Sequence, residues 1–185
     1  VKEQADVHVY IERKASLRSS YASTDDSESG EIQTKASMLT FGSIPGKLDD
    51  VMYGVLCPTT EDMQLKSVYT DDGLADWGVL TSIIKPSEAD PFRALSIKWN
   101  VNSPPLPLSA VVRTRDALYI ESSGFVVTPS GERIGYRMNH TVDLPAIPEL
   151  TELNIVRVKF SACEFFRQRG DNCVEVYSHI LFNPM

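Results

Sequence analysis

From Gly73 almost to the end of the chain, apolar side chains recur at every second position. This is the period of a β-strand with one buried face, because successive side chains of a strand point to opposite sides. In the segment 93–101, large apolar residues alternate with small or polar ones, and the pattern predicts that Lys98 points to water. So many consecutive antiparallel strands must curl, which predicts one long, curved sheet with a concave side. Further strands are predicted at 118–121, at 134–142 and on both sides of a hairpin loop at 167–171.

Two short helices are predicted to interrupt this sheet once, in the first half of the chain. Apolar residues between 48 and 56 recur at helical spacing and form one stripe. Pro58 ends that helix, and the capping Thr59 begins a second helix that runs to about Tyr69. The predicted fold class is therefore α+β. The remaining segments are predicted as strands at 7–12 and 32–41 and as a flexible, solvated loop at 18–30.

Length and charge limit what the chain can be. Its 185 residues, 42% of them hydrophobic, suit a single domain spanning 1–185. The chain begins with Val1 rather than Met, so we expect a fragment of a longer protein. Its net charge of −7 provides no basic field for nucleic acid, and it contains no apolar run of the ~20 residues that span a membrane. Three cysteines without a CxxC pair favour a reducing, cytoplasmic compartment.

The motifs that carry catalysis or bind metals and cofactors are missing from the sequence. The segment 42–48 lacks both the glycine spacing and the Ser or Thr of a phosphate-binding loop. The histidines have no HExxH spacing, and no serine lies in a GxSxG sequence. We therefore expect no catalytic residue, no metal ligand, no cofactor and no enzyme. Two polar residues each have two possible roles. His140 is either a hydrogen-bonded core histidine or a donor to a ligand, and Glu121 is either a solvated charge or a functional group that points inward.

Several motifs of the second half resemble those of a known family of domains. In the segment 112–121, Arg115-Asp116 precedes alternating apolar and aromatic residues, which is similar to a strand motif of START (steroidogenic-acute-regulatory-related lipid transfer) domains. The segment 141–145 resembles their Ser-Val-x-x-Pro motif, and 156–158 resembles the Val-Arg-Ala that follows it. The resemblance covers about 32–185. More specific similarity to the START-like domains of oomycetes, which often adjoin a FYVE zinc finger, lies at 90–93, 97–99, 131–136 and 163–168.

This resemblance implies a helix-grip fold, in which the curved sheet and a long C-terminal helix enclose one tunnel for a lipid. The chain ends at Met185, where the closing helix of the family should begin, so we expect that helix to be absent. Cholesterol-type members have an inward Arg at the position matched by Glu121, which argues against a sterol. A carboxylate in an apolar tunnel needs a partner, for which His140 is the first candidate and Arg113 the second. Such a carboxylate would disfavour anionic head groups.

The function expected from these features is that of a lipid-binding or lipid-transfer module and not of an enzyme. The partners would be one phospholipid or sterol-like molecule and, transiently, a membrane; the protein would be a monomer, cytoplasmic or peripheral on endosomal membranes. Phe125, Val126 and Val127 form an expected apolar gate, although an ordinary buried hairpin fits them equally well. The predicted ligand-binding residues are Glu121, His140, Arg113, Tyr119, Trp99, Tyr136 and Met138.

Two alternatives keep the same fold. In the first, the domain is a non-catalytic interaction or targeting module whose cavity is filled by large side chains. In the second, His140 or Glu121 lies beside a bound substrate in a cyclase or hydrolase. An apolar void of about 300 Å³ or more would favour ligand binding. The side chains that could fill the cavity are Trp77, Trp99, Phe160, Phe165 and Phe166.

Overall fold

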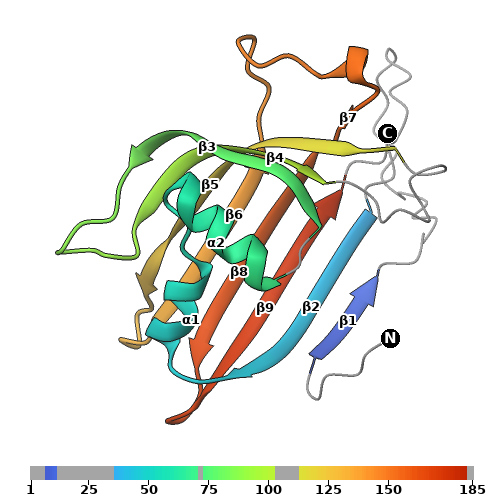
Figure 1. Cartoon of the computed structure of the whole chain (residues 1–185). Coiled ribbons are helices and arrows are strands. Elements are labelled where there is room, and N and C mark those ends of the chain that lie inside the picture. Colours follow the sequence, from blue (N-terminus) through green and yellow to red (C-terminus); the bar gives the residue numbers. More distant parts are fainter. Residues whose placement is uncertain (1–6, 12–35, 71–72, 103–112, 183–185) are drawn as a thin grey trace, which may run out of the picture.

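A computed structural model describes residues 7–11, 36–70, 73–102 and 113–182. Figure 1 shows one strongly curved sheet whose hollow holds two helices. The predicted loop at 18–30 lies outside the described residues, as does the start of the strand predicted at 32–41. The elements are β1 (Val7–Ile11), β2 (Ala36–Pro45), α1 (Leu48–Val55), α2 (Thr60–Thr70), β3 (Leu74–Ile84), β4 (Ala94–Asn102), β5 (Arg115–Val127), β6 (Arg133–Thr141), the 3-10 helix η1 (Thr151–Leu153), β7 (Val156–Arg157), β8 (Phe160–Gln168) and β9 (Cys173–Phe182).

The strands form a single sheet in the order β1-β2-β9-β8-β6-β5-β4-β3, with antiparallel pairing along this path. The short β7 pairs in parallel with the start of β5. The predicted α+β architecture, a curved antiparallel sheet with two short helices, is confirmed. In the described part of the chain, no helix follows β9, which ends at Phe182, and no helix is long and apolar enough to cross a membrane.

Helix α1 packs closely on one side of the sheet. Its Leu48 and Met52 are buried together with Phe166 of β8 and Val174 of β9. Gly135 of β6 allows this approach, because a Cβ there would overlap with the sulfur of Met52. We call this side of the sheet the helix-facing side and the opposite one the outer side.

The start of α1 is held by a side chain that is distant in sequence. The N-cap residue Lys47 makes no side-chain capping bond. The side chain of Gln168 supplies the capping bond instead, because its Oε1 accepts a hydrogen bond of 2.6 Å from the backbone N–H of Leu48. The Nε2 of Gln168 donates to the carbonyl oxygens of Gly46, Gly170 and Cys173. One amide thus joins the β8–β9 hairpin to the start of α1.

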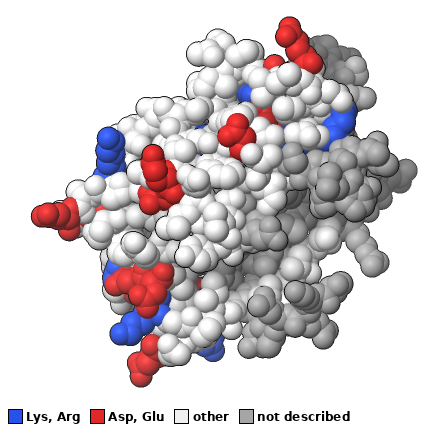
Figure 2. All heavy atoms as spheres, viewed as in Figure 1, with Lys and Arg blue, Asp and Glu red and all other residues white. Residues whose placement is uncertain are grey.

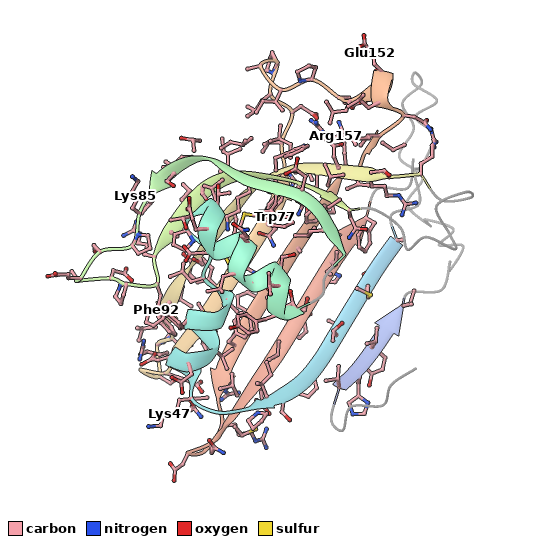
Figure 3. The ribbon with its side chains drawn as sticks, in the orientation of Figure 1. Lys47, Trp77, Lys85, Phe92, Glu152 and Arg157 are labelled. Atoms are coloured by element: carbon pink, nitrogen blue, oxygen red, sulfur yellow. The ribbon has the colours of Figure 1, made fainter. Side chains whose placement is uncertain are left out.

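A buried ion pair fixes the other end of the sheet. Arg157 Nη2 lies 2.6 Å from Asp116 Oδ2, with side chains that are 3% and 0% exposed. Trp99 Nε1 also donates to Asp116, over 3.0 Å. The guanidinium of Arg157 donates further to the carbonyl oxygens of Ile147 and Pro148. Figure 3 shows Arg157 at the upper end of the sheet, below the segment that carries η1. The two START-like motifs that contain Asp116 and Arg157 therefore meet in one hydrogen-bonded network.

The prediction of which side of β4 is buried was wrong. Ala94, Ser96 and Lys98 are the buried residues, while Leu95 and Trp99 on the outer side stay partly exposed. The reason is the position of the helices. Both lie on the side that carries Lys98, so the small and polar residues of β4 are covered and the large apolar ones are not.

Candidate functional site

Complementary charges gather in the middle of the helix-facing side. We call them the polar cluster: Lys98 of β4, Glu121 of β5, Arg137 and Asn139 of β6, and Glu164 of β8. Strand register brings them together, because Glu121 lies opposite Asn139 and Arg137 lies opposite Glu164. Lys98 lies opposite Tyr119, one position along its face from Glu121. Side chains at such positions of neighbouring strands are within reach of each other.

The polar cluster contains two ion pairs. Lys98 Nζ donates to Glu121 Oε1, and these side chains are only 2% and 12% exposed. With its side-chain amide turned so that the nitrogen faces Glu121, Asn139 donates a hydrogen bond of 3.1 Å to the other carboxylate oxygen of Glu121 and one of 3.3 Å to the carbonyl oxygen of Met138. Arg137 Nε donates to Glu164 Oε2 over 2.5 Å. Both carboxylates are thus partnered, as a charge removed from water must be.

Lys66 of α2 faces the polar cluster from the helix side. Burial lowers the pKa of Lys66, and the positive charge of Arg137 lowers it further, while Cys57, Glu121 and Glu164 act in the opposite direction. Within the described part of the chain, Lys66 has no carboxylate partner at ion-pair distance. It is therefore a partly buried cation without an ion pair to another described residue.

Two neighbouring acids stay neutral at physiological pH. Burial raises the pKa of Tyr119 far above its usual range, and the charge of Glu121 raises it further. Burial likewise raises the pKa of the Cys57 thiol, although Lys66 and Lys98 partly offset this effect. The carboxylates of Glu121 and Glu164 are therefore the negative charges beside these cations.

A groove opens between the two helices and reaches this region. We call it the inter-helix groove; it encloses about 360 Å³, which lies in the range of small-molecule sites. Lys66 and Cys57 line it, so the groove shares these residues with the surroundings of the polar cluster. The middle of the surface on this side shows few charged side chains (Figure 2). The apolar lining comes from Tyr53, Leu56, Pro58, Leu65 and Tyr69, among others.

An apolar strip continues the helix-facing side beyond the polar cluster. We define it as Phe160 and Ala162 of β8 with Ile180 and Phe182 of β9, which pair across the two strands. None of the four is fully buried, and Phe182 is 40% exposed. The ring of Phe160 lies 5.9 Å from that of Tyr119, which links the strip to the polar cluster. Charged and apolar surfaces thus lie side by side.

A second groove lies on the outer side of the sheet. It encloses about 380 Å³ and is lined by Leu95, Ile120, Met138, His140, Cys163, His179 and Leu181, among others. His140 Nδ1 lies 2.7 Å from Ser161 Oγ, and His179 Nε2 lies 2.9 Å from Ser37 Oγ. We call this the outer groove. Both histidines have hydroxyl partners, and no carboxylate is recorded next to them in the described structure.

The structure separates the predicted ligand-binding residues. Tyr119 and Glu121 lie on the helix-facing side, whereas Trp99, Tyr136, Met138 and His140 lie on the outer side. Arg113 precedes β5 and is exposed. The predicted partners of Glu121 were therefore wrong: neither His140 nor Arg113 pairs with it, because its partner is Lys98. Strand alternation keeps His140 on the face opposite Glu121.

Sequence reasoning missed four functional candidates, namely Lys66, Lys98, Arg137 and Glu164. Lys98 was assigned to solvent because its neighbours Leu95 and Trp99 looked like the core face. The available signal was charge complementarity, since the polar positions of one strand carry Lys98 and those of the next carry Glu121. Using that signal requires the register between β4 and β5, which depends on contacts distant in sequence.

The residues of the expected gate divide into two groups. Phe125 is partly buried and packs against the core around α1, with its ring 5.1 Å from that of Phe92. The guanidinium of Arg133 lies 4.0 Å from the centre of the Phe125 ring. Val126 and Val127 are 47% and 67% exposed at the end of the hairpin. The buried-hairpin alternative thus describes Phe125, while the two valines are available for contact.

Comparison with known proteins gives likenesses in structure alone. No family model and no curated protein sequence matches the chain. The human StarD13 (DLC2) lipid transfer and protein localization domain is similar at 13% identity and a TM-score of 0.54, over 80% of this chain and 61% of that structure. Human StAR-related lipid transfer protein 5 is similar at 10% identity and a TM-score of 0.55, over 100% of this chain and 72% of that structure. The fold is thus that of StAR-related lipid transfer domains, and the chain spans about three fifths of the length of the first of them.

Proposed function

We propose that this domain binds and transfers an amphiphilic lipid, held between the helices and the curved sheet. The observation that carries the proposal is the surface inside the curve. There a buried, ion-paired polar cluster adjoins both the apolar strip and the inter-helix groove. Such a surface matches a molecule with one polar end and one apolar end. The likeness in fold to lipid transfer domains supports this assignment.

The driving force would be removal of the lipid tail from water. Each Å² of apolar surface buried contributes roughly 25 cal/mol, so the apolar strip and the aromatic lining of the groove would supply affinity. The polar cluster would instead select the head group, because its donors and acceptors are fixed by the sheet. Exposed Val126 and Val127 would contact the bilayer during transfer.

We propose a module without catalysis. Burial raises the pKa of both Cys57 and Cys163, so neither thiol is activated as a nucleophile. Glu121 and Glu164 are tied to cations, which suits recognition better than proton transfer. A monomer in the cytoplasm, recruited to endosomal membranes by other domains of a longer protein, agrees with this role.

Lipid extraction and native mass spectrometry of the purified chain test the proposal. We expect a co-purifying lipid, or uptake of one from vesicles, at one molecule per chain. Two neighbouring residues of β8 provide a matched pair of variants, since Ala162 belongs to the helix-facing side and Cys163 to the outer side. Ala162→Trp should abolish lipid uptake, and Cys163→Trp should preserve it. The opposite result would move the ligand to the outer groove, and absence of lipid in the wild type would contradict lipid binding.

The outer groove favours the second candidate, an interaction or targeting domain. Its lining is apolar, and Met138, one of the lining residues, is 50% exposed. Of the large side chains that could fill the interior, Phe160 and Phe166 lie on the helix-facing side, whereas Trp99 and Phe165 lie on the outer side. This candidate replaces the first if the chain takes up no lipid.

A further inference from the structure

Lys66 is the cation of this region that forms no ion pair with another described residue. Lys98 is paired with Glu121 and Arg137 with Glu164, so the polar cluster is itself neutral. Asp62, the carboxylate that lines the inter-helix groove together with Lys66, accepts hydrogen bonds from the backbone N–H and the hydroxyl of Thr59. Tyr119 and Cys57 add no negative charge, because burial keeps both neutral.

We propose that Lys66 binds the anionic group, a carboxylate or a phosphate, of an amphiphile whose tail lies in the inter-helix groove. This inference rests on the proposed lipid-binding function and names its substrate class. Two observations support it: Lys66 has no ion-pair partner among the described residues, and its side chain lines the groove. An anionic group on the ligand would supply the ion-pair partner that Lys66 lacks among the described residues.

Glu121 does not oppose an anion here. An isolated carboxylate in this space would repel one, but Lys98 and Asn139 engage both oxygens of Glu121. Glu164 is paired with Arg137 in the same way. Lys66 is therefore the unpaired cation that a head group in the groove can reach, while the nearby carboxylate of Asp62 accepts hydrogen bonds from Thr59.

The partial burial of Lys66 disfavours its charged form in the unliganded protein. The proposal therefore predicts a pH dependence of anion binding. Burial and Arg137 lower the pKa of Lys66, so its charged form is disfavoured until an anion arrives. The titratable groups around it are Cys57, Arg137, Glu121 and Glu164, with Lys98 beside Cys57 and with Asp62 one turn earlier on α2 in the same groove lining. A side chain kept only for stability would not be a desolvated, unpaired cation. Anion binding should thus weaken as pH rises through the lowered pKa of Lys66.

The test measures the affinity of matched amphiphiles for the wild type and for the Lys66→Met and Lys85→Met variants of the full chain. Lys85 is an exposed lysine that follows β3, and Figure 3 shows it away from the helices. Affinities for oleate and oleoyl lysophosphatidate are measured by calorimetry at pH 7, below their micelle concentrations. Monooleoylglycerol and oleoyl lysophosphatidylcholine serve as ligands without net negative charge. Urea unfolding of each lipid-free variant supplies the stability readout.

We expect the wild type and Lys85→Met to bind at least one anionic ligand about tenfold or more tightly than its uncharged counterpart. Lys66→Met should lose this preference while its urea midpoint stays equal or rises, because the desolvated charge is gone. Whether oleate or the lysophosphatidate loses more affinity in Lys66→Met distinguishes a carboxylate from a phosphate as the preferred group. Equal binding of anionic and uncharged ligands would overturn the inference and leave lipid binding intact, as would a preference that survives in Lys66→Met. Failure of every amphiphile to bind would overturn both.

Discussion

Replacing Glu121 with Gln should destabilise the domain far more than replacing Glu121 and Lys98 together. Lys98 is 2% exposed, and Glu121 supplies the negative charge that pairs with it. Without that charge, Lys98 stays in a water-poor site without its carboxylate partner. The double variant Lys98→Met, Glu121→Gln removes the buried charge itself.

The magnitude follows from the burial of the pair. Breaking a buried ion pair on one side typically costs 3–5 kcal/mol, and the Gln side chain keeps one acceptor, so we expect about 3 kcal/mol for Glu121→Gln. In a domain of this length that corresponds to a fall of roughly 6–12 °C in the melting temperature. The double variant should lie within about 1 kcal/mol of the wild type, because apolar replacement of a buried pair is often neutral.

Urea unfolding of lipid-free protein at pH 7, analysed as a double-mutant cycle, measures both values. Asp143→Asn is the control, since it breaks the exposed pair between Asp143 and Lys159 and should leave the midpoint nearly unchanged. A loss below about 0.5 kcal/mol for Glu121→Gln would show that Lys98 reaches water or another partner. A double variant as unstable as the single one would also refute the reasoning.

Three further predictions concern the frame around the site. Gly135→Ala should lower the melting temperature through overlap with Met52, and adding Met52→Ala should recover part of the loss. Asp116→Asn should destabilise by about 3 kcal/mol and change the fluorescence of Trp99, whose indole N–H donates to that carboxylate; an unchanged spectrum would contradict the contact. Burial raises the pKa of Tyr119, so its contribution to stability is complete below the ordinary tyrosine pKa of about 10 and is lost at higher pH. Tyr119→Phe should therefore lose less stability than the wild type does between neutral pH and pH 11, and equal losses would count against the assignment.

The elements of this fold were predictable because their signals are local. The apolar spacing from Leu48 onward predicts α1, and the alternation after Gly73 predicts the strands that the structure contains. The START-like motifs also led to the correct fold, although each motif is short. Asp116 and Arg157, which two of these motifs contain, form the buried network at the end of the sheet.

The site was less predictable because it depends on which side of the sheet the helices cover. Alternation separates Lys98 from Trp99 but does not say which of them lies under α1 and α2. The partner of Glu121 depends in addition on the β4–β5 register, which no local pattern fixes. His140 was grouped with Glu121 for the same reason, since a one-residue change in register moves a side chain to the other face.

The position of β9 has a consequence for how the protein is made. This strand is synthesised after the other described strands, yet it lies between β8 and β2, and Ser37 of β2 bonds to His179 of β9 across 142 positions of sequence. At about 5–20 residues per second, the ribosome leaves β2 without this partner for on the order of ten seconds. Pairing between strands distant in sequence slows folding, and the unpaired edge of β2 can meanwhile pair with strands of other chains. Production of this domain should therefore depend on chaperones that shield β2 until β9 emerges.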